Sequence, residues 1–340
     1  MREASSVPSS SAPTVRDVAV RAGVSPMTVS RTMSGGLNVR PEVQERVFKA
    51  VQELGYWRNH SARNIRLGRP SGLVGIVVTN IGNPYYGEFA LGIEGIAEEY
   101  GRQIVVGNTG EDPGRERELL TDFAARQIEG VILVPAGNGL ELPGSNRLAH
   151  VPLVLASRTI DGLAADTVLV DDIEGARSGT QCLLDDGHTR IAFLGDAAGI
   201  STTRRRLHGF STALSIAGIA QEEVLQVPCR DAPTAQSEVA RLLNAADPPT
   251  AFFSSNNRIT VGALRAICEY RNAHPGFPVP ALACFDDVEL ADLLQVPLVV
   301  MSHDPKELGE QAARLLFDRL AGSVPAEPRD VRVAVTIHRY

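Results

Sequence analysis

Hydroxyl and guanidinium side chains cluster in one short stretch near the N-terminus, where their spacing suits contact with nucleic acid. Ser25, Thr28 and Ser30 supply hydroxyls that can donate to phosphate oxygens. Arg31 can reach O6 and N7 of a guanine, a bidentate contact worth about 1–3 kcal/mol of discrimination. Val29 lies between them and is predicted to face a core. These residue types indicate recognition of DNA rather than catalysis.

Start and stop signals around these residues predict three helices. Thr14 can cap a first helix that ends at Gly23, and Ser25 caps a second that begins with a proline and ends near Met33. A third helix opens at Pro41 and finishes near Gly55. Two short helices around a tight turn with a third behind them form a helix-turn-helix, whose second helix enters the major groove.

Charge is distributed unevenly along the chain. Residues 1–70 hold eleven Lys or Arg and five Asp or Glu, a net of +6, whereas the remaining residues carry −13, which together give −7. A small basic unit joined to a large acidic one indicates an N-terminal polyanion binder, with chance fluctuation as the alternative.

The sequence lacks the motifs typical of several enzyme and nucleotide-binding classes. No strand is followed by GxGxxG, and no GxxxxGK[ST], HExxH or GxSxG run occurs. The four cysteines are scattered, which favours small core residues over a disulfide framework or a zinc site. The chain has no apolar run of membrane-spanning length and its first residues have no apolar signal region, so we expect a cytosolic protein. We expect no catalytic residues, no metal and no cofactor.

The chain after residue 70 alternates short apolar runs with helical stretches. The first run is Leu73–Thr79, and the alternation continues to Ala281–Cys284. This order predicts α/β structure with parallel sheets covered on both faces, and the length suits two doubly wound subdomains. A ligand is expected where loops leave the carboxyl ends of the strands.

The runs Thr14–Ala19, Ala22–Ser25, Thr28–Arg31 and Leu54–Tyr56 closely resemble the headpiece of the LacI/GalR family of bacterial repressors. The body is similar to the effector domain of that family, which shares the fold of periplasmic sugar-binding proteins. The body segments that carry this likeness are Asn83–Tyr86, Gly187–Phe193, Arg206–Phe210 and Cys284–Asp287. The resemblance gives His188 a structural role in a turn.

The resemblance implies a domain plan. The plan is a disordered tail at 1–13, a headpiece at 14–58, a hinge helix or linker at 59–70 and an effector-binding and dimerisation domain at 71–340. Within the body it places an N-subdomain at about 71–169 and 301–322, and a C-subdomain at about 170–300 and 323–340.

The resemblance also assigns DNA contacts. Pro26, Met27 and Arg31 occupy base-reading positions, although Pro26 and Met27 offer almost no side-chain hydrogen bonding and leave discrimination to Arg31, thymine methyls and DNA shape. The backbone contacts that it assigns are Ser25, Thr28, Ser34 and Asn38, and we add Thr14 and Ser30 as further expected backbone contacts. In the hinge, Ala62, Arg63 and Ile65 would lie in the minor groove, with Ile65 as the wedge. The alternative for the hinge is a solvated basic tether.

The effector pocket of the family lies between the subdomains. The matching positions are Tyr85, Tyr86, Ser157, Arg158, Arg206, Asn256, Asn257 and Asp286. Arg206 and Asp286 could clamp sugar hydroxyls while a tyrosine stacks on a ring. Read from the residues alone, Arg206 could equally belong to a solvated basic face, Asp286 could cap a helix and Tyr86 could be core.

Two of these positions depart from the family, which commonly has aspartate where Ser157 and Asn257 stand. Losing both carboxylates while keeping Arg158 and Arg206 makes the cleft less negative. One hypothesis is therefore that the effector carries a carboxylate or phosphate.

The resulting expectation is a ligand-responsive transcriptional regulator, a repressor by resemblance, that binds a near-palindromic double-stranded operator. Residues 324–340 lack leucine heptads, which favours a homodimer over a tetramer. We expect it in the bacterial cytoplasm, associated with the nucleoid when bound to DNA. The alternative is a cytosolic binding protein for sugars or sugar acids without promoter control, and whether the effector induces or co-represses stays open.

Overall fold

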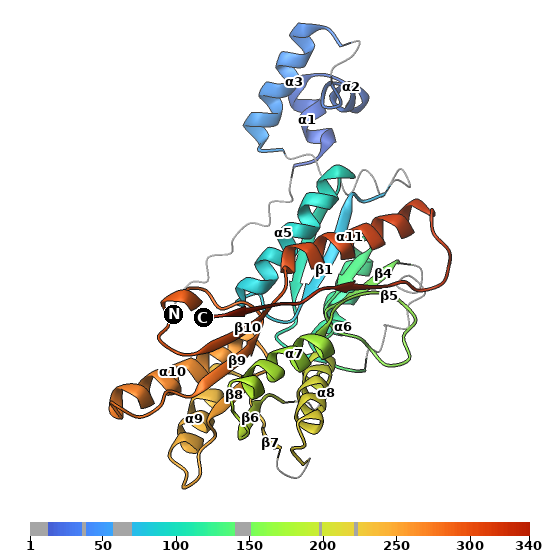
Figure 1. Cartoon of the computed structure of the whole chain (residues 1–340). Helices are drawn as coiled ribbons and strands as arrows, with labels where there is room; N and C mark the ends of the chain where they lie inside the picture. Colours follow the sequence, from blue (N-terminus) through green and yellow to red (C-terminus); the bar gives the residue numbers. More distant parts are fainter. Residues whose placement is uncertain (1–12, 36–38, 57–69, 140–150, 197–198, 221–223) are drawn as a thin grey trace, which may run out of the picture. The chain divides into compact units, whose positions relative to one another are not determined.

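The computed structural model describes residues 13–35, 39–56, 70–139, 151–196, 199–220 and 224–340. The chain divides into two compact units, Met1–Arg69 and Pro70–Tyr340 (Figure 1). Each unit is built around its own core. None of the described helices is both long and apolar enough to cross a lipid bilayer.

The first unit contains the three predicted helices. They are α1 (Val15–Ala22), α2 (Pro26–Thr32) and α3 (Pro41–Leu54). Thr14 and Asp17 form a reciprocal capping box on α1, and Gly23 ends that helix in the left-handed conformation at φ 65°. Val18, Val29 and Val47 are completely buried where the three helices meet. The local signals therefore produce the elements that the sequence predicts.

The second unit contains two six-stranded sheets covered by helices on both faces, as the alternation predicts. The first sheet has the order β11-β5-β4-β3-β1-β2 and is parallel at every pairing. Its strands are β1 (Leu73–Val78), β2 (Gln103–Asn108), β3 (Val131–Leu133), β4 (Leu153–Ala156), β5 (Asp166–Val170) and β11 (Asp330–Val333). Its helices are α5 (Pro84–Glu99), α6 (Pro113–Ala125) and α11 (Pro305–Ala321).

The second sheet has the order β12-β10-β9-β8-β6-β7, and only its edge strand β12 runs antiparallel among the described strands. Its strands are β6 (Ile191–Leu194), β7 (Leu225–Val227), β8 (Ala251–Ser254), β9 (Ala281–Phe285), β10 (Leu298–Ser302) and β12 (Thr336–Arg339). Its helices are α7 (Asp172–Asp185), α8 (Ser201–Ile216), α9 (Ala232–Leu243) and α10 (Asn257–Ala273), with a 3₁₀ turn at Ala291–Leu293.

Successive side chains of each strand point to opposite faces of the sheet, which explains why both faces are covered. In β1, Ile76 and Val78 belong to the core under α5 and α11, whereas Val77 packs with Leu120 of α6. The second sheet does the same, with Phe193 packed under α7 and α8 and Leu194 packed under α9 and α10. Both sheets are therefore sandwiched between helices.

The chain passes from one sheet to the other after β5, after β10 and after β11. This order corrects the predicted boundaries. Residues 323–340 were expected wholly in the C-subdomain, but β11 pairs with β5 of the first sheet. Residues 301 and 302 end β10 in the second sheet rather than belonging to the N-subdomain, and Val170 belongs to the first sheet. Composition could not reveal these pairings because they join distant segments.

Candidate functional site

The second helix of the first unit exposes the residues predicted to read bases. Met27 is 65% exposed, and Pro26 and Arg31 are also exposed, whereas Val29 beside them is completely buried. The burial of Val29 anchors the helix on its inner side. An exposed face of this kind can enter a DNA groove.

Several hydroxyls predicted to bind phosphates also cap helices. The Ser25 hydroxyl accepts from the Thr28 backbone N–H at 3.1 Å and shares a hydrogen bond of 2.9 Å with the Thr28 hydroxyl. Thr14 belongs to the capping box of α1, and Ser34 donates to the carbonyl oxygen of Ser30 at 2.7 Å. Asn38, Ala62, Arg63 and Ile65 lie outside the described residues.

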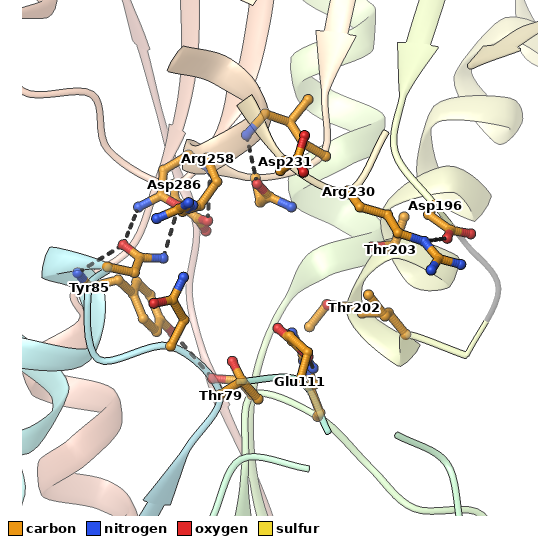
Figure 2. A pocket seen from close by; sticks show the side chains of 18 of the residues that line it. Thr79, Tyr85, Glu111, Asp196, Thr202, Thr203, Arg230, Asp231, Arg258 and Asp286 are labelled. Carbon is orange, nitrogen blue, oxygen red and sulfur yellow. Dashed lines mark hydrogen bonds and ion pairs between the residues drawn. The ribbon is translucent and has the colours of Figure 1, made fainter. Parts of the chain in front are cut away.

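A cavity of about 480 Å³ lies in the second unit between the two sheets, at the carboxyl ends of their strands. Figure 2 shows side chains from both subdomains around an open centre, with Tyr85 and Asp286 on one side and Arg230 and Asp196 on the other. All eight positions implied by the resemblance line it: Tyr85, Tyr86, Ser157, Arg158, Arg206, Asn256, Asn257 and Asp286.

A buried ion cluster underlies one wall of the cavity. Asp172, which is 0% exposed, accepts from Arg205 at 2.7 Å and from Arg206 Nε at 2.7 Å. Arg206 also donates to the Ser255 carbonyl at 2.6 Å, and its guanidinium carbon lies 3.7 Å from the centre of the Phe285 ring. With 5% exposure, Arg206 is a buried cavity residue, so the alternative of a solvated basic face is wrong.

Asp286 combines two contacts. Its Oδ1 lies 3.4 Å from Arg206 Nη2, and its Oδ2 accepts from the Asn257 backbone N–H at 3.3 Å. The carboxylate therefore contacts the beginning of α10, as the helix-cap reading expects, and it also lines the cavity. Asn256 caps the same helix through its Oδ1, which accepts from the Ile259 N–H at 3.0 Å.

The two tyrosines differ in their surroundings. Tyr85 places its hydroxyl 3.2 Å from the Ser157 hydroxyl and 3.2 Å from His303 Nε2. Tyr86 shares a hydrogen bond of 2.8 Å with the Thr79 hydroxyl and is 8% exposed, so it is both core and cavity wall. Burial raises the pKa of both phenols, which keeps them neutral hydrogen-bonding groups.

A reciprocal amide pair links the subdomains at the edge of the cavity. The Asn83 amide nitrogen donates to Asn257 Oδ1 at 3.1 Å, and the Asn257 amide nitrogen donates to Asn83 Oδ1 at 2.8 Å. An aspartate at position 257 could accept from Asn83 but could not donate back. The departure from the family therefore creates a matched contact here.

The cavity charges are balanced. Arg158 makes a bidentate pair with Glu111 at 2.7 and 2.9 Å, and Arg230 pairs with Asp196 at 2.5 Å. The charged lining residues are Arg158, Arg206, Arg230 and Arg258 with Glu111, Asp196, Asp231 and Asp286. Arginines that already face carboxylates leave little net positive charge for an anionic ligand.

Backbone strain gathers at the cavity. Glu111, Ser157 and Asp286 have φ values of 65°, 60° and 70°, in the left-handed region that residues other than glycine rarely adopt. All three line the cavity. Strained conformations of this kind often collect at functional sites because they direct a side chain that a relaxed backbone would turn away.

Sequence reasoning missed Glu111, Asp172, Arg205 and His303. Asp172 begins a helix, where an acidic residue is ordinary, so its burial under two arginines left no local signal. His303 precedes Asp304 and Pro305, a helix start that the sequence does display. Within the described residues, the buried side-chain atoms without a hydrogen-bond partner are Ser255 Oγ, Asp286 Oδ1 and His303 Nδ1. The same part of the chain contains no cluster of His, Cys, Asp and Glu suited to a metal.

Comparison with known proteins matches both units. Residues 14–59 match the bacterial regulatory proteins of the lacI family, and residues 180–339 match a periplasmic binding protein-like domain. The ribose operon repressor of Haemophilus influenzae is 30% identical over 311 residues, covering 90% of this chain and 92% of that protein.

A regulator named CelR from Thermobifida fusca is 33% identical over 340 residues, covering 96% of both chains. A solved structure described as a transcriptional regulator CelR–cellobiose complex superposes with a TM-score of 0.69 at 28% identity, covering 96% of this chain and 99% of the other. With the helix-turn-helix and the two-sheet body described above, these matches show that the chain belongs to the lacI family of bacterial regulatory proteins and is a DNA-binding transcriptional regulator rather than an enzyme.

Proposed function

We propose that this regulator is a repressor that binds a near-palindromic operator as a homodimer. A sugar in the cavity would either lower or raise its affinity for that operator. The observation that carries the proposal is the joining of a helix-turn-helix unit to a polar cavity between two sheets. A two-fold symmetric dimer presents two second helices, which need two half-sites. The protein would act in the bacterial cytoplasm, at the nucleoid while bound.

DNA recognition would be divided between two kinds of contact. Arg31, with Pro26 and Met27, would meet base edges, while hydroxyls near the helix ends hold the phosphates. The segment 59–70 would act as the hinge through Ala62, Arg63 and Ile65. The backbone contacts would be Thr14, Ser25, Thr28, Ser30, Ser34 and Asn38.

The cavity supports a neutral, polyhydroxyl effector. Arg206 and Asp286 offer a donor and an acceptor side by side, and Tyr85 offers an aromatic face. Arg158 is already paired with Glu111, which argues against the carboxylate or phosphate that the two departures from aspartate suggested. The CelR complex contains cellobiose and the H. influenzae relative is named a ribose operon repressor, so both sugars are suitable probes.

Ligand and DNA would be coupled through the subdomains. A sugar that contacts both walls favours one relative arrangement of the two sheets and so shifts the operator affinity, typically by about 1–3 kcal/mol. Linkage requires the operator to change sugar affinity by the same factor.

The decisive experiment measures operator binding by gel shift over genomic fragments, followed by titration with cellobiose, ribose and fructose 1-phosphate. We expect specific, salt-sensitive binding that a neutral sugar changes more than the phosphate does. Arg31→Ala should relax sequence preference, whereas Lys49→Ala on α3, an equal change of charge, should preserve it. A variant lacking residues 1–69 that still holds the fragment as firmly as the full chain would refute the proposal.

A further inference from the structure

A chain of hydrogen-bonding groups runs from a segment between the sheets to the cavity wall. His303 follows β10 in the segment that leads to α11, and its side chain is 0% exposed. Its Nε2 lies 3.2 Å from the Tyr85 hydroxyl, which lies 3.2 Å from the hydroxyl of Ser157. Ser157 lines the cavity, so the imidazole reaches a ligand through two intervening hydroxyls.

The other nitrogen of the ring faces a carboxylate. His303 Nδ1 lies 4.0 Å from Asp286 Oδ1, and both atoms lack a hydrogen-bond partner. A negative charge on that side favours the neutral tautomer that carries its proton on Nδ1. Nε2 is then an acceptor, and the Tyr85 hydroxyl must donate to it.

The surroundings keep the imidazole neutral near pH 7. Burial lowers the pKa of His303, and Arg206 of α8 acts in the same direction. Asp286 and Asp287, which follow β9, and Asp172 of α7 oppose this by attracting the proton. The Tyr85 phenol of α5 faces the ring as a neutral group because burial raises its pKa. Burial is the larger effect, so the tautomer rather than a charge sets the hydrogen-bond direction.

We propose that His303 is a positioning residue that orients the hydroxyls of Tyr85 and Ser157 and thereby selects a ligand that donates a hydroxyl hydrogen to Ser157. The proposal rests on the effector role of the cavity. Because Tyr85 donates to the imidazole, its oxygen accepts from Ser157. With its hydrogen engaged by Tyr85, the Ser157 oxygen keeps only acceptor lone pairs for a ligand in the cavity, which suit a sugar hydroxyl and offer no donor to a carboxylate or phosphate.

Protonation of His303 would reverse the direction of both hydrogen bonds in this chain. A proton taken from solvent by Nε2 makes that nitrogen a donor to Tyr85, and Tyr85 then donates to Ser157. Each hydroxyl keeps its own hydrogen and only rotates, so the Ser157 hydrogen turns toward the cavity. The selectivity at this position would change from a hydroxyl donor to an acceptor.

The first test needs no ligand. In the full chain labelled with ¹⁵N-histidine, NMR at pH 7.5 reports which ring nitrogen of His303 carries the proton, and His303→Gln assigns the signals by their loss. We expect the proton on Nδ1. A proton on Nε2, or on both nitrogens, overturns the proposal. If His303→Gln does not fold, Tyr85→Phe assigns the same ring, because losing the hydrogen bond shifts the Nε2 resonance.

The second test asks whether the imidazole controls the tyrosine. In the chain labelled with ¹³C-tyrosine, the Tyr85 ring signal should follow the ionisation of His303 as the pH falls from 7.5 to 5. It should stay constant in His303→Gln, which keeps a hydrogen-bonding group without titrating. His274→Gln, which alters a ring stacked on Tyr270 of α10, is the matched control and should leave the wild-type response intact.

A Tyr85 signal that does not follow the ionisation of His303, or that moves equally in His303→Gln, contradicts the proposal. Neither test depends on a sugar, so failure here is distinct from failure of the sugar screen.

Discussion

Two buried aspartates, Asp166 and Asp172, each accept hydrogen bonds from two arginines, yet their surroundings differ. Asp166 lies in β5 and is bound by Arg319 of α11 at 2.6 Å and by Arg329 before β11 at 2.8 Å. Arg329 also pairs with Asp318 at 2.7 Å. Asp172 begins α7 and is bound by Arg205 and Arg206 of α8, of which Arg206 lines the cavity.

The two clusters differ in whether nearby buried polar atoms lack a hydrogen-bond partner. The Asp166 cluster contains none of the unpartnered buried side-chain atoms found in the described part of the chain, whereas the Asp172 cluster is bordered by three of them, on Ser255, Asp286 and His303. In a fully satisfied ion cluster, loss of one partner leaves buried charge without compensation. A cluster bordered by unpaired donors and acceptors keeps hydrogen-bonding capacity for something else, at a cost in stability.

Removing Asp166 should give the largest effect on the free energy of unfolding. Asp166→Ala leaves two partly buried arginines without their carboxylate, and we expect a loss of about 3–5 kcal/mol in the free energy of unfolding. Urea denaturation measures it. Asp247→Ala, which breaks an exposed pair with Arg190, is the control and should cost less than about 1 kcal/mol. Equal losses in the two variants would erase the distinction between the clusters.

Lowering the pH should weaken the same Asp166 cluster. Burial raises the pKa of Asp166, but the hydrogen bonds from Arg319 and Arg329 outweigh it and lower that pKa to about 2. Because the folded pKa is depressed, its stabilisation is complete above the unfolded value of about 3.9 and is lost as the pH falls toward 2. The free energy of unfolding should therefore drop by about 2 kcal/mol more in the wild type than in Asp166→Asn between pH 5 and 2. Parallel pH profiles would contradict this.

A change beside the Asp172 cluster should instead alter the affinity for a ligand. Asp286→Asn keeps the shape and tolerates the left-handed backbone, but it removes the charge that faces Arg206. We expect a weakening of about 10- to 150-fold in the affinity for a bound sugar, with the free energy of unfolding changed by about 1 kcal/mol or less. Calorimetric titration and urea denaturation provide the two values. A large loss of stability without a loss of affinity would make this cluster structural as well.

The smallest effect should come from the amide pair across the subdomains. A double-mutant cycle on Asn83→Ala and Asn257→Ala should give an interaction energy of about 0.5–1.5 kcal/mol, because two neutral hydrogen bonds are lost together. Thermal unfolding of the four proteins measures it. The pair Gln236 and Glu269, which joins α9 to α10 inside one subdomain, is the reference. Only the Asn83–Asn257 cycle should also change sugar affinity.

Local signals explain what could be predicted from sequence. Thr14, Ser25 and Gly23 determine helix ends through contacts within a few residues, so the first unit was predictable element by element. The cavity positions came from the family pattern. Residues whose role depends on distant partners were missed, such as Asp172 beneath Arg206 and His303 beside Tyr85. The pairing of β11 with β5 was missed for the same reason.

The repeated passage of the chain between the two sheets limits how such a protein can be recombined. No single cut in the gene separates the two halves of the body, because β11 belongs to the first sheet and β12 to the second only a few residues later. One cut near Pro70, by contrast, divides the chain between its compact units. Exchange of DNA-binding modules between relatives is therefore open to a single crossover, whereas the halves of the sensing body must be inherited together.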